Sequence, residues 1–395
     1  MLVQDAVLSL ILVIYALHNL YSALSAHTII TRSGAQVWNR QLDFDGVYER
    51  LGIIVPLYHE NSSEIAKTFN SISGQDYPKE LLFVRIVVED GDVGTIEAVN
   101  ENLSLLSASD IRCELVVKPP PRTCKASALN FSSKKTREDI VVVYDGGDVF
   151  DANQFKAAVS LLQKGYNAVG VRVLRGGTSL LSRFSLVETM LWYDVALPTV
   201  FRLTGYPLLS GEGMFIKREF LEAAGGFKEV LTEDSYMTLM MASLGKKAAL
   251  LDSRIYENAP RSWSALIKQR TRWYRGYIQC AKDLLRTGMP MKTRVLLFVV
   301  FLSPLFLIAI TASMTTTLIG ILSFFGLETV IVPSFQWWSY ATAMITLMST
   351  LYVYQNDHRN RRIAILLPLY WTLMGLVSLY ALLTPKVSWY KTSRP

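Results

Sequence analysis

Carboxylates follow a run of β-branched residues in the segment IVVVYDGGDVFD, residues 140–151. The run ends at Asp145, two glycines follow, and Asp148 comes next. Mg²⁺ prefers hard oxygen ligands and often uses one or two protein carboxylates together with substrate phosphates. Glycines here would leave room for a bulky ligand. The pattern indicates a site for a metal and a phosphate, although an ordinary turn is the alternative because Asp and Gly are common turn formers.

A second pair of carboxylates, Glu233 and Asp234, opens a helical pattern in LTEDSYMTLMMASLG, residues 231–245. Thr232 stands where a helix N-cap is expected. Acidic residues are favourable in a first helical turn because they oppose the helix dipole. The pattern therefore fits an ordinary helix start as well as a catalytic acid or base.

A third segment, residues 261–286, combines helical apolar spacing with seven basic residues and one acid. It comes just before an apolar stretch, which favours a helix lying on an anionic membrane surface. Gln269, Arg272 and Trp273 stand at positions i, i+3 and i+4, so they share one helix face. That face is a candidate for substrate contact in addition to its place at the membrane.

The elements that must position these residues follow from near-continuous apolar runs that alternate with segments of helical length. Strands are expected at 51–56, 83–90, 113–118, 140–145 and 167–173, with helices such as 62–73 and 151–164 between them. This order predicts an α/β fold with a mostly parallel, doubly wound sheet. Ligands of such sheets bind beyond the carboxyl ends of the strands. Three of the strands run into acids there, namely Glu60, Asp90 and Asp145.

Long stretches without charge occupy the C-terminal third of the chain, and only 18% of all residues are charged, below the usual quarter. About 20 apolar residues are enough to cross a bilayer. The uncharged stretches lie between Arg294 and Glu328, between Glu328 and Asp357, and between Arg362 and Lys386. They predict an α-helical membrane domain of three transmembrane helices over 293–385, followed by a tail over 386–395.

A fourth apolar run, residues 6–26, predicts an N-terminal transmembrane helix over 1–28. A cleaved signal peptide is the alternative, but Asp5, the lack of a basic start and the length of the run favour a retained anchor. The basic loop 356–362 is expected on the cytoplasmic side. This orientation predicts a multi-pass plasma-membrane protein with a cytoplasmic globular domain, although the basic tail then falls outside, against the same rule.

The net charge of +7 limits the classes of partner that we expect, and the three cysteines bear on metal binding and redox state. No nucleic-acid recognition motif is present, so no nucleic-acid partner is expected, and the charge fits a lipid bilayer or a phosphorylated substrate better. Cys113, Cys124 and Cys280 lack metal-ligand spacing and are expected to be reduced. The sequence gives no indication of oligomeric state.

These features, taken in order, resemble the membrane-bound members of glycosyltransferase family 2, such as cellulose synthase, hyaluronan synthase and ceramide glucosyltransferase. The resemblance spans about residues 50–275 and includes the acid that ends a strand, the Asp-rich turn, T-E-D and Q-x-x-R-W. It implies a GT-A nucleotide-diphospho-sugar transferase domain over 29–258 and amphipathic interfacial helices with Q-x-x-R-W over 259–292. It also implies a divalent metal cofactor, Mg²⁺ or Mn²⁺.

The resemblance assigns roles to individual residues. Asp234 would be the catalytic base, and the metal would be held by Asp145 and Asp148. The donor would be held by Pro56, Glu60, Asp90, Arg122, Lys125 and Asp145. The acceptor and the diphosphate would contact Gly211, Glu212, Gly213, Glu233, Gln269, Arg272 and Trp273. The family's D-x-D pattern would place its second acid at Gly147, so metal ligation is expected to fall on Asp148, with Asp145 contacting the ribose or the metal through water.

The expected function is inverting transfer of a sugar from a nucleotide-diphosphate sugar, with UDP as the family's commonest nucleotide. Four spans are few for a channel around a glycan, which favours a lipid or lipid-linked acceptor. The alternative is a processive polysaccharide synthase with a glycan acceptor. A non-enzymatic nucleotide-binding transporter is disfavoured because the last three apolar stretches lack the charges that ion coupling uses.

Overall fold

Nine strands form one sheet in the computed structural model, which describes residues 23–40, 44, 46–324, 359–384 and 392, with scattered positions within 9–20 and 349–357. The order across the sheet is β1-β9-β7-β8-β5-β2-β3-β4, and β6 pairs with β9. The strands are β1 (Trp38–Asn39), β2 (Leu51–Leu57), β3 (Leu82–Glu89), β4 (Arg112–Lys118), β5 (Ile140–Val143), β6 (Val149–Phe150), β7 (Ala168–Gly176), β8 (Met214–Lys217) and β9 (Ala248–Asn258).

The five predicted strands are confirmed as β2, β3, β4, β5 and β7, but the sheet is mixed. β8 runs antiparallel to both of its neighbours, β5 and β7. Its first residue, Met214, pairs with Val143 at the carboxyl end of β5. The antiparallel direction therefore brings the loop before β8, with Gly211 and Glu212, to the edge of the sheet that carries Asp145.

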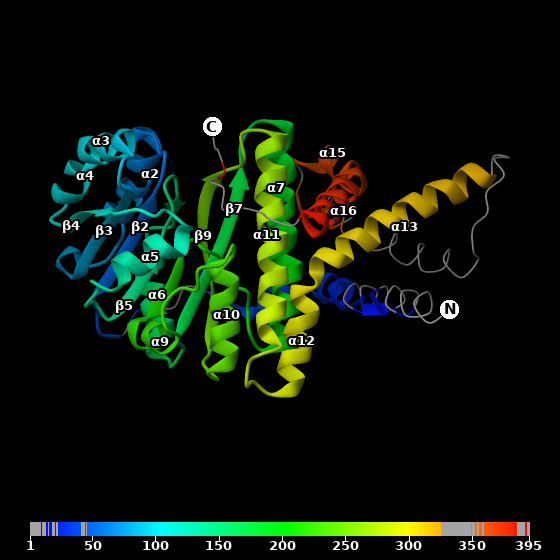
Figure 1. Cartoon of the computed structure of the whole chain (residues 1–395), viewed down its shortest axis with the longest axis horizontal. Helices are drawn as coiled ribbons and strands as arrows, with labels where there is room; N and C mark the ends of the chain where they lie inside the picture. Colours follow the sequence, from blue (N-terminus) through cyan, green and yellow to red (C-terminus); the bar gives the residue numbers. More distant parts are fainter. Residues whose placement is uncertain are drawn as a thin grey trace.

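Helices cover both faces of the sheet (Figure 1). In β2, Ile53 and Val55 point into one hydrophobic cluster and Ile54 points into another, and all three are fully buried. Strands buried on both faces read as continuous apolar runs. The helices of this part are α2 (Ser62–Ser73), α3 (Val93–Asn102), α4 (Ser104–Ser107), α5 (Lys125–Ser133), α6 (Gln154–Gln163), α9 (Arg218–Ala223) and α10 (Glu233–Ser243), with 3₁₀ turns η1 (Ser33–Val37) and η2 (Lys79–Leu81).

A second group of helices lies beyond β7 and β9 (Figure 1). It contains α7 (Leu180–Leu191), the π-helical turn η3 (Trp192–Ala196), α8 (Leu197–Thr204), α11 (Trp263–Leu284), α12 (Met291–Phe301), α13 (Ser303–Phe324), α15 (Arg361–Ala364) and α16 (Leu367–Leu383). A third apolar cluster joins α7, α11 and α16 through Phe184, Leu266 and Met374. The basic helix predicted over 261–286 is thus α11, and one side of it is packed inside the protein.

Among the helices that the structure describes, none alone has the length and apolar character needed to cross a bilayer. α12 and residues 303–315 of α13 together have the required length and apolar character, but the two helices are bent by 48° where they meet. α16 is apolar and shorter. Much of the predicted N-terminal span, most of the predicted span between Glu328 and Asp357, and the tail except Thr392 lie outside the described residues.

Candidate active site

A cavity of about 860 Å³ lies at the carboxyl ends of β2 and β5, where ligands of α/β sheets bind. Its wall is built from the loops after these strands, the loop before β8, and the helices α5, α7, α10, α11, α13 and α16. Most of the predicted site residues line it: Pro56, Glu60, Arg122, Lys125, Asp145, Gly211, Glu212, Glu233, Asp234, Gln269, Arg272 and Trp273. Asp90, Asp148 and Gly213 do not line it.

Lys125, the first residue of α5, joins three separate segments of the chain. Its Nζ lies 2.6 Å from Oδ1 of Asp145 and 3.9 Å from Oε1 of Glu233, and it donates a hydrogen bond to the Gly211 carbonyl at 2.9 Å. Burial opposes the charge of Lys125, but the carboxylates of Asp145, Glu233 and Glu212 outweigh burial and raise its pKa. The site therefore holds a fixed cation in a cavity rich in carboxylates.

The turn after β5 explains why Asp148 is absent from the cavity wall. Asp148 is fully buried, and its Oδ2 accepts a hydrogen bond from the Asp145 backbone N–H at 2.8 Å. Thr68 Oγ donates to the Asp145 carbonyl and accepts from the Gly147 N–H, each at 2.9 Å. Gly147 adopts a φ of 93°, which favours glycine. Asp148 thus shapes the turn that presents Asp145, and its predicted metal ligation gains no support from this position.

Glu233 and Asp234 begin α10 at the cavity. Burial and, to a smaller extent, the neighbouring Asp234 carboxylate raise the pKa of Glu233 to about 7, against the opposing effect of Lys125 and Arg272. Burial also raises the pKa of Asp234, against a hydrogen bond that its Oδ1 accepts from the Ser235 N–H at 2.7 Å. Carboxylates with raised pKa values are suited to accept a proton near neutral pH.

Thr232 stands at the N-cap of α10, as predicted, but its side chain makes no capping hydrogen bond. Its Oγ lies 3.9 Å from Sγ of Cys280 instead, against α11. A Cβ added at Gly276 of α11 would fall inside the Thr232 side chain, 2.9 Å from its Cβ. The close approach of α10 and α11 at this point brings the two acids next to the Q-x-x-R-W face.

Gln269, Arg272 and Trp273 of α11 all line the cavity, so the predicted shared face is confirmed. Arg272 donates through Nη1 to the Leu231 carbonyl at 3.2 Å. Burial lowers the pKa of Arg272, while Glu233, Asp234 and Asp145 oppose this effect. Its guanidinium therefore lies in the field of the same carboxylates that surround Lys125.

The side of the cavity near β2 offers flat side chains. The guanidinium carbon of Arg122 lies 3.5 Å above the ring centroid of Tyr58, and that ring lies 3.9 Å from the His59 ring. The His59 backbone N–H donates to Oδ2 of Asp92 at 2.7 Å. The predicted acid Asp90 is exposed instead, and Glu89 lines the cavity while pairing with Lys118 at 3.2 Å.

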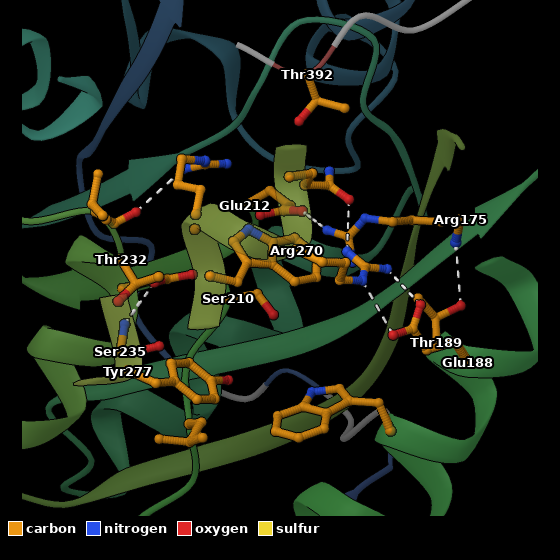
Figure 2. Close-up of a pocket in the computed structure, with 18 of the residues that line it drawn as sticks. Arg175, Glu188, Thr189, Ser210, Glu212, Thr232, Ser235, Arg270, Tyr277 and Thr392 are labelled. Atoms are coloured by element: carbon orange, nitrogen blue, oxygen red, sulfur yellow. Dashed lines mark hydrogen bonds and ion pairs between the residues drawn. The ribbon is translucent and has the colours of Figure 1, made fainter. Parts of the chain in front are cut away.

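The sequence did not predict several charged residues of the cavity, because their ion-pair partners are distant in the chain. Arg175 pairs with Glu212, and Arg270 pairs with Glu188 (Figure 2). Arg175 also pairs with Glu257, which does not line the cavity. One available signal was Glu188, the single acidic residue of α7. The structure also explains Gly213, whose φ is 64° and whose N–H donates to the Val143 carbonyl at 2.8 Å, which makes it a structural glycine.

The opposite side of the cavity is apolar. Ile29 lies shortly before η1, Phe306, Leu307 and Ile310 belong to α13, and Trp371 belongs to α16. These side chains line the same cavity as the acids and cations described above. One continuous space therefore has a charged part beside the sheet and an apolar part beside the C-terminal helices.

Carboxylates near the turn after β5 provide the chemistry that a divalent cation needs. Asp145 lines the cavity, and Oε2 of Glu64, also a lining residue, is buried without a hydrogen-bond partner beside Gly147. Hard oxygen donors of this kind fit Mg²⁺ or Mn²⁺ held jointly with phosphate oxygens. Within the described part of the chain, no group of three or more His, Cys, Asp or Glu residues is arranged to hold a metal by itself.

Comparison with known proteins agrees with the fold. Residues 49–276, more than half of the chain, match the family model described as Glycosyltransferase like family 2. A probable glycosyltransferase of Bacillus subtilis (strain 168), YdaM, is 25% identical over 373 residues, which cover 87% of each chain. The mannosyltransferase PcManGT from Pyrobaculum calidifontis, solved with GDP-Man and Mn²⁺, superposes with a TM-score of 0.60 and 21% identity, over 93% of this chain and 97% of that chain. This last similarity supports the fold alone.

Proposed function

This chain belongs to the glycosyltransferase like family 2 and is a glycosyltransferase, and we propose that it is an inverting enzyme that moves a sugar from a nucleotide-diphosphate sugar to a membrane lipid or lipid-linked acceptor. The single observation that carries the proposal is the continuous cavity. Its charged part suits a sugar diphosphate, and its apolar part, lined by Phe306, Ile310 and Trp371, suits the hydrocarbon of an acceptor.

The donor would lie with its diphosphate near Lys125 and Arg272. Phosphate oxygens form strong charge-assisted hydrogen bonds with ammonium and guanidinium groups. Both cations would stabilise the negative charge that grows on the leaving diphosphate. The pair formed by Arg122 and Tyr58 offers a flat surface for the nucleotide base. The complex of the similar mannosyltransferase with GDP-Man supports a nucleotide-sugar donor, while the family resemblance favours UDP.

A divalent metal fits the same place, and Asp145 is the residue we propose to hold it. When bound, the metal would neutralise part of the diphosphate charge. Asp145 would then exchange its present partner, the Lys125 ammonium at 2.6 Å, for the metal, which frees Lys125 for a phosphate oxygen. The Mn²⁺ in the mannosyltransferase complex supports a divalent ion here.

Asp234 is the proposed general base. It would take the proton of the acceptor hydroxyl as the oxygen attacks the anomeric carbon of the donor and the bond to the diphosphate breaks. A single displacement from the opposite face inverts the anomeric centre, so an α-linked donor gives a β-linked product. Trp273 and Gln269, on the neighbouring face of α11, would orient the acceptor.

The proposed acceptor places the enzyme at a membrane. The uncharged stretches of the C-terminal third are long enough to cross a bilayer, and we propose that they anchor the protein with the catalytic domain in the cytoplasm. Fractionation of the expressed chain with the membrane, resistant to carbonate extraction, would support this arrangement. Recovery in the carbonate-soluble fraction would contradict it.

The function is tested with the full chain, purified in detergent and incubated with radiolabelled UDP-glucose, UDP-N-acetylglucosamine or GDP-mannose, with Mg²⁺ or Mn²⁺ and a total bacterial lipid extract. The expected result is label in the organic phase as a single new species, from at least one donor. A ladder of long water-soluble products would favour the processive synthase instead. Intact donors in every combination would contradict the proposal.

A further inference from the structure

Glu188 of α7 and Arg270 of α11 form a two-point ion pair inside the protein (Figure 2). Nε of Arg270 lies 3.2 Å from Oε1 of Glu188, and Nη2 lies 2.5 Å from Oε2. The Arg270 side chain is 1% exposed. The geometry matches the planar fork of the guanidinium to both carboxylate oxygens, which fixes the orientation of Arg270 as well as its position.

Arg270 in turn contacts two residues of the proposed acceptor face. Its Nη1 donates to Oε1 of Gln269 at 2.6 Å, and its guanidinium carbon lies 4.0 Å from the ring centroid of Trp273. Stacking of a desolvated guanidinium on an indole is attractive and favours one ring orientation. The rotamers of Gln269 and Trp273 therefore depend on where Glu188 holds Arg270.

Glu188 has a second partner on the apolar side of the cavity. The hydroxyl of Tyr370 in α16 donates to Oε2 of Glu188 at 2.7 Å, and the Tyr370 ring stacks on Phe184 with 5.0 Å between centroids. The next residue of α16, Trp371, lines the apolar part of the cavity. Glu188 thus connects α16, which lines the apolar part, with the face of α11 that carries Gln269 and Trp273.

Stability alone gives little reason to bury such a pair. Desolvation of two charges often cancels their attraction, and apolar residues of similar volume are frequently as stabilising or more so. The pair can instead impose one arrangement on its neighbours. The pair lies at the cavity wall, between the charged and the apolar part. The ligand whose binding depends on this arrangement is therefore expected to be the acceptor.

We propose that Glu188 is a positioning residue for the acceptor. Through Arg270 it holds Gln269 and Trp273 in the orientation that binds the polar head of the acceptor. Through Tyr370 it fixes the position of this binding face relative to α16. This inference rests on the proposed function, because it requires an acceptor with an apolar part. Glu188 does not contact the donor diphosphate in this assignment, so its loss affects acceptor use selectively.

The test compares Glu188→Gln with wild type in the full, detergent-purified chain, with the total lipid extract titrated as acceptor. Gln keeps the shape and removes the charge. The apparent KM for lipid is expected to rise and kcat to fall, together by up to about 100-fold, as for a displaced orienting group. The KM for the nucleotide sugar is expected to stay within about twofold, well under the tenfold that 1.4 kcal/mol represents.

Glu138→Gln is the matched control, since Glu138 and Arg85 form another buried ion pair, at 2.7 Å, and neither residue lines the cavity. It should lower the melting temperature without changing the KM for lipid. Tyr370→Phe keeps the ring on Phe184 and removes one hydrogen bond from Glu188. It should shift the KM for lipid in the same direction as Glu188→Gln by a smaller factor, and it carries the test if Glu188→Gln does not fold.

An unchanged KM for lipid in Glu188→Gln or, where that variant does not fold, in Tyr370→Phe would overturn the inference. A KM for the nucleotide sugar that rises as much as the KM for lipid would also overturn it, because the residue would then act on the whole cavity. Failure of the proposed function is distinguishable from both outcomes. In that case the wild-type chain itself would put no label into lipid.

Discussion

The ammonium of Lys125 lies 2.6 Å from Oδ1 of Asp145, at the place where the first turn of α5 meets the turn after β5. Both side chains line the cavity, and a Cβ at Gly211 would lie 3.2 Å from the same Nζ. This cation already stands in the cavity wall and would meet a diphosphate once Asp145 takes the proposed metal as its partner; charge positioned in advance is the main source of transition-state stabilisation in such sites. The predictions below follow from this arrangement and from the acids beside it.

Removing the Lys125 cation should lower the transfer rate while the protein stays folded. Lys125→Met is expected to reduce kcat about 10²- to 10³-fold, the usual loss for one group that stabilises developing charge. It should also weaken donor binding measured by calorimetry. Lys156→Met is the control, because Lys156 pairs with Asp76 at 2.6 Å outside the cavity. Equal effects of the two variants would argue against a role for Lys125.

Transfer should depend on pH through the acids of α10. Burial raises the pKa of Glu233 to about 7 and also raises the pKa of Asp234. A general base acts in its deprotonated form, so kcat/KM is expected to rise with pH as Asp234 loses its proton, at a higher pH than an ordinary Asp carboxyl, and then to level off. The measurement is a profile from pH 5 to 8.5 at fixed metal concentration. A profile already flat at pH 5 would show that no base with a raised pKa limits the reaction.

Any side chain at position 211 should damage the site more than the fold. Gly211→Ala places a Cβ 3.2 Å from Nζ of Lys125, so the ammonium must shift by a few tenths of an ångström, and 3.4 Å from Oδ2 of Asp234, in direct contact with the proposed base. Displacement on this scale is expected to lower kcat by about tenfold or more. Gly94→Ala is the matched control, since a Cβ there meets no atom within 4 Å. Identical rates for the two variants would contradict the expected crowding.

The contact between α10 and α11 can be tested by adding a methyl group at Gly276 and then removing side-chain atoms from Thr232. Gly276→Ala places a methyl group inside the Thr232 side chain and is expected to cost about 1–3 kcal/mol of unfolding free energy, as overpacked cores do. It should reduce transfer as well, because the contact sets the place of Asp234. Adding Thr232→Ala removes the nearest atoms, so the double variant should be more stable than Gly276→Ala. Additive losses would mean that the two residues are not coupled.

Much of the fold follows from the sequence because its signals are local. The apolar runs that form β2 and β5 are buried and read as core strands, and the acids that follow them, Glu60 and Asp145, line the cavity as parallel-sheet geometry requires. The spacing of Gln269, Arg272 and Trp273 likewise fixes a helix face without tertiary information. These features carry the family resemblance and most of the site.

The remaining features depend on contacts across the chain. β8 is only four residues long, and its antiparallel direction is set by its neighbours β5 and β7, not by its own pattern. The Asp148 side chain points inward and accepts a hydrogen bond from the Asp145 N–H. The sequence D-G-G-D alone does not predict this interaction. The pairing of Glu188 with Arg270 joins α7 to α11, and the local sequence around either residue does not predict the other as its partner.

The most direct test of the central claim is Asp234→Asn, assayed for donor binding and for sugar transfer on the same preparation. Asn keeps the size of the side chain and cannot act as the base. The expected result is donor binding close to wild type by thermal shift and transfer reduced by about 10²- to 10⁴-fold. Transfer at the wild-type rate would contradict the assignment of Asp234 and, with it, the account of how this cavity performs glycosyl transfer.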